Sequence, residues 1–157
     1  MEYPKLYLRG ISRDDSQFFN PPIPNTTFRI PTANIFSGGF DSNDERQDDF
    51  EELSINWIDD DGAFEVAFNQ KNSKSGECQF KAGVGVYDFG TLKEIASSQY
   101  FKEVLDYERA PIPNNKYHGN ILLHKDVSSD KSMKHMKNMI CGKIAMAFVD
   151  HKENPNV

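Results

Sequence analysis

The sequence predicts a single α+β domain, with a mixed or mostly antiparallel sheet of five to seven strands and two or three helices packed on it. A length of 157 residues suits one domain, here residues 1–150, followed by a C-terminal tail at 151–157. Several segments alternate apolar and polar residues as strands do, whereas residues 62–71 and 131–141 repeat apolar residues with a helical period. The chain also has 12 Phe, six Tyr and one Trp for a core.

The first 40 residues predict short extended segments. Lys5–Ile11 is rich in strand-forming residues, and Thr26–Ile30 and Ala33–Phe36 are shorter strand candidates. The prolines of Asn20–Pro24 predict a loop between them.

A concentrated negative charge follows. Residues 41–61 contain ten carboxylates and one arginine, while the whole chain has a net charge of −6, so the remaining residues together carry a charge of +3. Like charges repel, and Asp, Asn and Ser side chains compete for backbone hydrogen bonds. We therefore expect an acidic loop at about residues 41–52.

The middle of the chain changes from a strand period to a helix period. Residues 53–58 predict a strand whose polar face carries Ser54 and Asn56. Asp61 is a natural N-cap for the helix expected over residues 62–71.

The patterns over residues 77–109 predict secondary structure with different degrees of regularity. Residues 77–86 alternate most regularly and predict a strand. Thr91–Glu94 matches a capping box at the start of a short helix, and residues 100–109 suit a helix or a strand equally.

The last third predicts strand, helix and strand over residues 120–124, 131–141 and 144–148. Ser129 or Asp130 would cap the helix, Gly142 would end it, and its lysines would form the solvent-exposed face.

The most site-like segment is Pro111–Lys125, where imidazole, amide, phenol and ammonium groups are close together in the sequence. Each strand residue advances about 3.3 Å, so His118 and His124 would lie roughly 20 Å apart, too far to share a metal ion. No metal site is therefore predicted.

A single histidine remains as a candidate. Tyr117, His118 and Asn120 are the predicted ligand-binding residues, and His118 and Arg9 are the candidate catalytic residues. Alternatively, His118 hydrogen-bonds the preceding turn and fixes a bend that requires Gly119.

The acidic segment is a candidate surface for a basic protein partner. Its spacing does not fit a calcium loop of the EF-hand type, and a solvated loop leading to a helix N-terminus is the alternative interpretation. The predicted partner-binding residues are Asp44, Glu45, Asp48, Asp49, Glu51 and Glu52.

Several classes of function are disfavoured by what the sequence lacks. It has no nucleotide-phosphate loop, zinc-protease helix or serine-hydrolase elbow, so no cofactor is predicted. Net negative charge disfavours nucleic-acid binding. Cys78 and Cys141 show no metal or disulfide spacing, and no segment is apolar enough for a signal peptide or membrane span, so a soluble cytoplasmic protein is expected.

Two resemblances carry functional expectations. Arg9-Gly10 after a first strand and Ser37-Gly38-Gly39 after a later one resemble the order found in ADP-ribosyltransferase folds, which implies dinucleotide binding. Residues 113–121, followed by a lysine-bearing helix, resemble short uncharacterised bacterial proteins. The second resemblance implies a bacterial origin, possible proximity to defence genes and no activity.

Local charge and missing catalytic motifs together favour a non-enzymatic interaction protein, an accessory or neutralising subunit that binds a basic partner. The alternative is a small enzyme or ligand-binding domain with a pocket near Arg9 and His118. The sequence does not indicate an oligomeric state.

Overall fold

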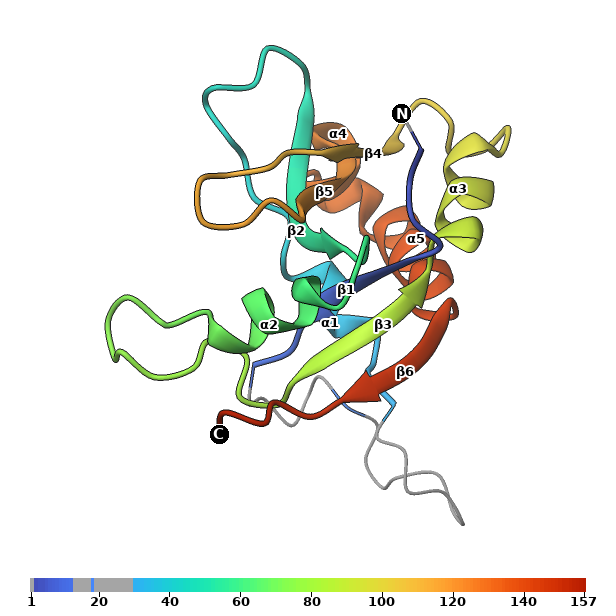
Figure 1. The fold of residues 1–157 in the computed structure, drawn as a ribbon. Coiled ribbons are helices and arrows are strands. Elements are labelled where there is room, and N and C mark those ends of the chain that lie inside the picture. Colours follow the sequence, from blue (N-terminus) through green and yellow to red (C-terminus); the bar gives the residue numbers. More distant parts are fainter. Residues whose placement is uncertain (1, 13–17, 19–29) are drawn as a thin grey trace.

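The computed structural model describes residues 2–12, 18 and 30–157. These residues form the expected α+β fold, with one sheet of six antiparallel strands in the order β4-β5-β2-β1-β3-β6 (Figure 1). The strands are β1 (Leu6–Gly10), β2 (Phe50–Trp57), β3 (Val84–Asp88), β4 (Leu105–Arg109), β5 (His118–His124) and β6 (Phe148–Lys152). The helices are α1 (Asn34–Ser37), α2 (Gly62–Asn69), α3 (Phe89–Ser97), α4 (Lys125–Ser128) and α5 (Lys134–Ala145), with a 3-10 turn at Lys131–Met133.

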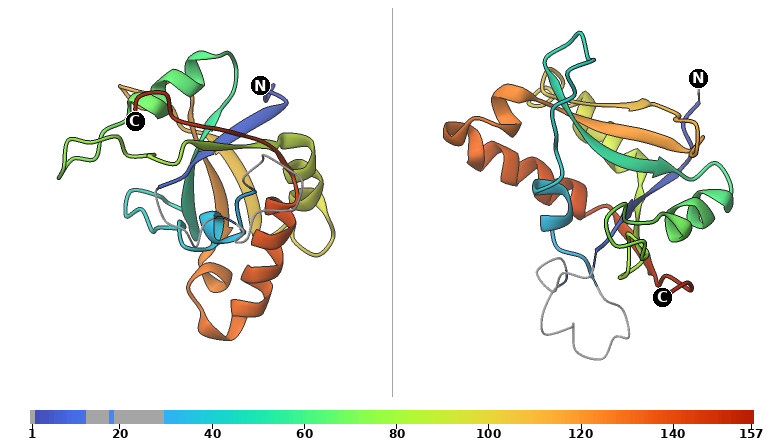
Figure 2. Two further views of the ribbon diagram at one scale, coloured as in Figure 1. Left: turned by 90° about the horizontal axis from the view of Figure 1, so that it is seen from below. Right: turned by 90° about the vertical axis from the view of Figure 1, so that its left-hand side faces the viewer.

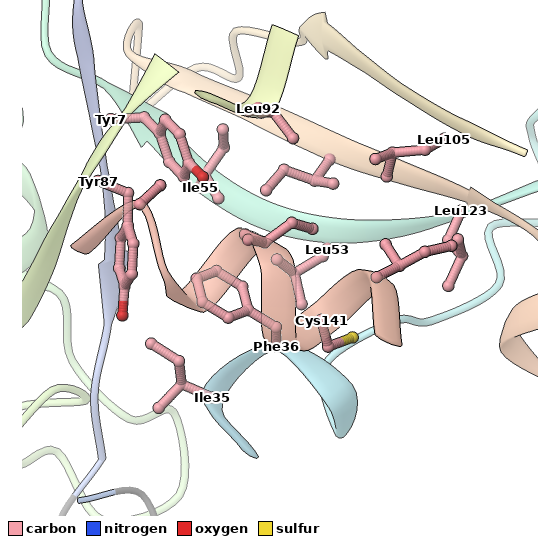
Figure 3. Close-up of a cluster of buried hydrophobic side chains, with 14 of the residues drawn as sticks. Tyr7, Ile35, Phe36, Leu53, Ile55, Tyr87, Leu92, Leu105, Leu123 and Cys141 are labelled. Atoms are coloured by element: carbon pink, nitrogen blue, oxygen red, sulfur yellow. The ribbon is translucent and has the colours of Figure 1, made fainter. Parts of the chain in front are cut away.

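The helices cover the two faces of the sheet unequally (Figure 2). On one face α1, α3, α4 and α5 pack against the larger hydrophobic cluster, in which side chains from β2 and β5 meet Phe36 of α1 and Cys141 of α5 (Figure 3). On the other face α2 alone packs against a smaller cluster around Leu8 and Val84.

Strand alternation sorts neighbouring residues between these two clusters. Tyr7 of β1 is fully buried in the larger cluster, and Leu8 is buried in the smaller one. In β2, Leu53, Ile55 and Trp57 enter the larger cluster, as the apolar face of the expected strand requires.

Trp57 explains why residue 119 is a glycine. The indole Nε1 of Trp57 donates to the Glu108 carbonyl oxygen at 3.0 Å, and it passes directly over Gly119. A Cβ at Gly119 would lie 2.1 Å from that nitrogen. The sequence had indicated a bend that requires Gly119, but Gly119 lies inside β5. The glycine is required because the Trp57 indole approaches it closely.

The expected strand at Ala33–Phe36 is wrong, because Asn34–Phe36 belong to α1 and Ala33 is its N-cap. Ile35 and Phe36 are consecutive, and both are buried on the same side of the sheet. A strand would send them to opposite faces, whereas a helical turn can bury both.

The long strand expected at residues 77–86 is also wrong over its first half. Only β3, from Val84, is extended in the sheet, and residues 79–83 form turns and bends. Gly83 has φ +88°, and a Cβ there would lie 2.0 Å from the Lys152 carbonyl oxygen. The regular alternation therefore spans a chain reversal and not one strand.

The helix expected at the capping box begins earlier than predicted. Asp88 precedes α3 and accepts a hydrogen bond from the Thr91 backbone N–H at 2.9 Å, so the helix starts at Phe89. The ambiguous residues 100–109 divide into a turn followed by β4.

The C-terminal helix is longer than predicted. Asp130 caps the 3-10 turn as expected, but α5 continues through Gly142 to Ala145, so both the helix end at Gly142 and the strand at 144–148 are wrong. Ile140, Cys141 and Ile144 form the buried stripe. The strand is β6, which includes residues 151 and 152 of the expected tail.

Two further expectations concern the N-terminal segment, which the structure describes only in part. The loop at 20–24 and nearly all of the strand at 26–30 lie outside the described residues. In the part of the chain that the structure describes, no helix combines the length and apolar character needed to cross a bilayer.

Candidate functional site

A cleft of about 640 Å³ opens on the α2 side of the sheet. Strands β1 and β2 form its floor, α2 and the residues after it form one wall, and the turn at residues 112–118 forms the other. It brings together segments that are far apart in the sequence, and both Arg9 and His118 line it. Two of the residues that the sequence proposed for its alternative site therefore line one cleft.

Strand pairing places the polar side chains at this floor. Ser54 and Asn56 alternate with the core residues of β2, so they point to the cleft side of the sheet. Asn56 pairs with His118 across β2 and β5, which brings the histidine beside both residues.

The His118 ring is held at both nitrogens. Its Nδ1 lies 2.7 Å from the Ala110 carbonyl oxygen, and its Nε2 lies 3.2 Å from the Ser54 hydroxyl oxygen. Because a carbonyl oxygen can only accept, Nδ1 carries a proton, and when Nε2 carries none it accepts from the Ser54 hydroxyl. The sequence predicted a bond to the preceding turn as the alternative, and the partner is the carbonyl of Ala110, just before that turn. The other ring nitrogen is bonded to Ser54 in the cleft.

Two buried asparagines make the cleft wall rigid. Asn115 donates from Nδ2 to Asn56 Oδ1 at 2.8 Å, and Asn56 donates from Nδ2 to the Ala63 carbonyl oxygen at 3.2 Å. Asn115 Oδ1 also accepts from the Tyr117 backbone N–H at 3.0 Å. This chain of hydrogen bonds fixes the turn before His118 relative to β2 and α2.

Arg9 lines the cleft, but its guanidinium group is bonded on the opposite face of the sheet, where α1 packs. Nε donates to the Ile35 carbonyl oxygen at 3.2 Å, and Nη1 donates to the Ser54 carbonyl oxygen at 2.8 Å. Burial lowers the pKa of Arg9. The side chain therefore connects α1 to β2 and holds the Ser54 backbone in place.

Tyr117 is a structural residue in this arrangement. It packs in the smaller cluster, and its hydroxyl donates to Asp60 Oδ1 at 2.5 Å. That bond raises the pKa of Tyr117 to about 12 and lowers the pKa of Asp60. Asp60 Oδ1 also accepts from the Gly62 N–H at 2.8 Å, so the carboxylate at the start of α2 is Asp60 and not Asp61, the predicted cap.

Asn120 is buried beneath the same face, where it pairs with Ser54 across β2 and β5. Its Oδ1 has no hydrogen-bond partner within the described residues. Neither Asn120 nor Tyr117 is among the residues that line the cleft. Of the three predicted ligand-binding residues, His118 is the one that lines it.

The acidic segment is largely paired within the chain. Arg46 forms ion pairs with Asp48 and Glu52 at 2.8 Å and with Glu108 of β4, and these bonds raise the pKa of Arg46 and lower that of Asp48. Residues 50–52 of the expected loop belong to β2.

The other predicted partner-binding carboxylates divide into paired and exposed groups. Glu51 accepts from the hydroxyls of Ser128 and Ser129, and Asp49 lies 3.1 Å from Lys125 Nζ. Asp44 and Glu45 are exposed.

Sequence reasoning did not select Ser54, which it interpreted only as part of the polar face of a strand. The available signal was its alternation with Leu53 and Ile55. This alternation does not show that β2 pairs with β5, the pairing that brings His118 beside Ser54. Across residues 2–12, 18 and 30–157, no three His, Cys, Asp or Glu side chains are grouped so as to hold a metal ion.

The cleft thus places a hydroxyl group and an oriented imidazole beside a space of about 640 Å³. No protein-family model matches the chain, and the searches for similar curated proteins and solved structures found no significant match.

Proposed function

We propose that this protein is a small ligand-binding enzyme whose site is the cleft at Ser54 and His118. The observation that carries the proposal is the hydrogen-bond chain from Ser54 Oγ through the His118 ring to the Ala110 carbonyl oxygen. It supplies a nucleophile, a base and a group that orients the base, which is the arrangement used in nucleophilic catalysis. Its place in a 640 Å³ cleft gives a substrate access to the hydroxyl.

The chemistry that fits these groups is hydrolysis of a small polar ester. Ser54 Oγ forms a bond to the ester carbonyl carbon while its proton passes to His118 Nε2. The ester C–O bond then breaks, and His118 returns the proton to the leaving oxygen. A water molecule attacks the acyl-serine in the same way and releases the acid. The Ala110 carbonyl stabilises the imidazolium during both steps.

Side chains around the hydroxyl define the ligand class. Glu65 and Lys71 line the cleft with opposite charges, and Asn114 adds an amide. Asn114 is the proposed donor to the negative charge that develops on the substrate oxygen, because the Lys71 ammonium group already donates to Cys78 Sγ at 3.6 Å. This balance favours an uncharged polar substrate over a dinucleotide or another multiply charged ligand.

A fluorophosphonate reagent tests the nucleophile directly, with adduct sites identified by peptide mass spectrometry. We expect one adduct on Ser54, none in Ser54→Ala, and labelling slower by about 100-fold or more in His118→Gln, because general-base assistance is lost. Ser42→Ala, at an exposed serine, is the matched control and should label like the original protein. Thermal unfolding of each variant checks that it is folded. Equal labelling with and without His118 would refute the assigned roles.

A second candidate function is binding of a basic protein partner by the acidic segment. The observation that favours it is that Asp44 and Glu45 are exposed and that the Asp49 side chain is 64% exposed. Pull-down of partners should then weaken in high salt and in the triple variant Asp44→Asn, Glu45→Gln, Asp49→Asn. Salt-insensitive binding would exclude this mechanism.

A further inference from the structure

A second hollow lies between α3 and α5. These two helices are neighbours in Figure 1. This α3–α5 groove has a volume of about 790 Å³. Its apolar lining residues are Ile95, Tyr100, Phe101, Met136, Met139 and Met146. It shares no lining residue with the Ser54–His118 cleft.

The apolar side chains of the groove are unusually exposed. Tyr100 and Met146 are each 84% exposed, and Met139 is 44% exposed. Isolated exposed apolar residues are common, but several around one hollow indicate an interaction site. Methionine side chains are flexible and polarizable, so they adapt to a partner's shape.

The charge beside the groove is positive. Residues 131–145 contain four lysines and no carboxylate, in a chain whose net charge is −6. Lys143 and His135 line the groove itself, and Glu94 stands on the α3 side. Lys131 and Lys134 are exposed on the adjoining surface of the 3-10 turn and α5. A complementary partner therefore combines apolar residues with carboxylates.

Nearby contacts show which lysines are available. Lys137 Nζ donates to the Ser128 carbonyl oxygen at 2.9 Å and lies over the Phe40 ring, so it serves the fold. Lys143 is exposed at the groove, and it forms no hydrogen bond or ion pair with the residues that the structure describes. It is the cation best placed to meet a carboxylate on an occupant of the groove.

We propose that the α3–α5 groove binds an amphipathic helix from an acidic partner protein. Apolar side chains at i, i+3, i+4 and i+7 of that helix enter the groove between the two helices. Its carboxylates lie over α5 and meet Lys143 and the neighbouring lysines. A second copy of this chain is a poorer fit, because the two Phe residues flanking its acidic loop, Phe40 and Phe50, are partly buried. This inference does not depend on the proposed enzyme activity.

A labelled synthetic helix tests the proposal by fluorescence anisotropy. The probe is an 18-residue peptide of Leu at i, i+3, i+4 and i+7 with Glu and Ala elsewhere, of about the length that an isolated helix needs in water. Control peptides have the same composition in scrambled order, or Lys in place of Glu. We expect the original protein to bind the acidic amphipathic peptide at least about tenfold more tightly than either control.

Protein variants locate the binding. Tyr100→Ala combined with Met146→Ala should weaken binding by about tenfold or more, as loss of interface anchors does. Lys143→Glu should weaken binding of the acidic peptide and strengthen binding of the Lys-containing peptide. Val149→Ala, at an apolar β6 residue that is 53% exposed and outside the groove, is the matched control and should bind normally. All these side chains are exposed, so thermal unfolding should be little changed.

Three outcomes would overturn the proposal. Equal affinity for the ordered and scrambled peptides would show that the groove does not recognise an amphipathic helix. Unchanged binding in the groove variants would show that the peptide binds elsewhere. Sedimentation that shows a dimer lost in Tyr100→Ala with Met146→Ala would assign the groove to a second copy.

Discussion

At the scale of single residues, Tyr117 shows how a side chain with chemical potential is committed to the fold. Its hydroxyl and the Gly62 N–H both donate to Asp60 Oδ1, which joins the turn before β5 to the start of α2. A Cβ at Gly62 would lie 2.2 Å from the Tyr117 hydroxyl oxygen, so the glycine makes room for this bond. The phenol therefore positions the cleft wall without contacting a ligand.

The Tyr117–Asp60 pair predicts a pH window. The lowered pKa of Asp60 gives stabilisation that is present above the ordinary Asp pKa and is lost as pH falls through the lowered value. The Tyr117 pKa, raised to about 12, gives stabilisation that is present below pH 10 and is lost as pH rises toward 12. We expect Asp60→Ala to move the ultraviolet titration of one tyrosine from about pH 12 toward 10.

Tyr117→Phe provides the control for this titration. In that background, Asp60→Ala should leave the ultraviolet titration of the remaining tyrosines unchanged. A shift of the same size in both backgrounds would show that another tyrosine responds to Asp60.

At the scale of elements, two glycines with positive φ have different environments. Gly76 has φ +72° and open space where a Cβ would stand. Gly83 has φ +88° and leads into β3, with the Lys152 carbonyl oxygen of β6 against it. The first glycine supplies only conformational freedom, whereas the second also allows two chain segments to meet closely.

Alanine at each glycine should separate these two effects. Gly76→Ala should lower the free energy of unfolding by about 1–2 kcal/mol, the usual cost of a left-handed backbone for a residue with a Cβ. Gly83→Ala adds a clash with backbone and should cost about 1–3 kcal/mol more. Urea unfolding of both variants measures the difference, and equal losses would contradict the close approach.

These elements also show what a sequence can predict. Periodicity located β1, β2, α2, β5 and the start of the C-terminal helix, because each buries one face against the core. It failed at residues 33–36 and 77–83, where a short helix and a chain reversal imitate strand patterns. For the candidate site, the sequence predicted Arg9 and His118, together with Tyr117 and Asn120, which do not line the cleft. Ser54 becomes visible only when β2 pairs with β5, a contact between residues far apart in the chain.

At the scale of the whole molecule, one sheet separates two hydrophobic clusters. Trp57 of β2, the single tryptophan, lies in the larger cluster beside Tyr7 of β1. Leu8, which follows Tyr7 in β1, lies in the smaller cluster. Because both clusters depend on the same backbone hydrogen bonds, we expect them to unfold together. The acidic segment is also connected to the sheet, because Arg46 forms an ion pair with Glu108 of β4.

Leu8→Ala tests this coupling. Removing this buried side chain should cost about 2–5 kcal/mol and lower the unfolding midpoint. Fluorescence of Trp57, which reports the opposite face, and far-ultraviolet circular dichroism should show the same lowered midpoint. Different midpoints from the two signals would show that the faces unfold separately.

The sheet order leaves β4 and β6 at its two edges, and both edges are charged. Asp106 and Glu108 alternate along β4, and Asp150 and Lys152 alternate along β6. A strand from another molecule that added to either edge would have to bury or compensate these charges. The charges on β4 and β6 therefore disfavour aggregation through strand addition at either edge of the sheet that the described residues form.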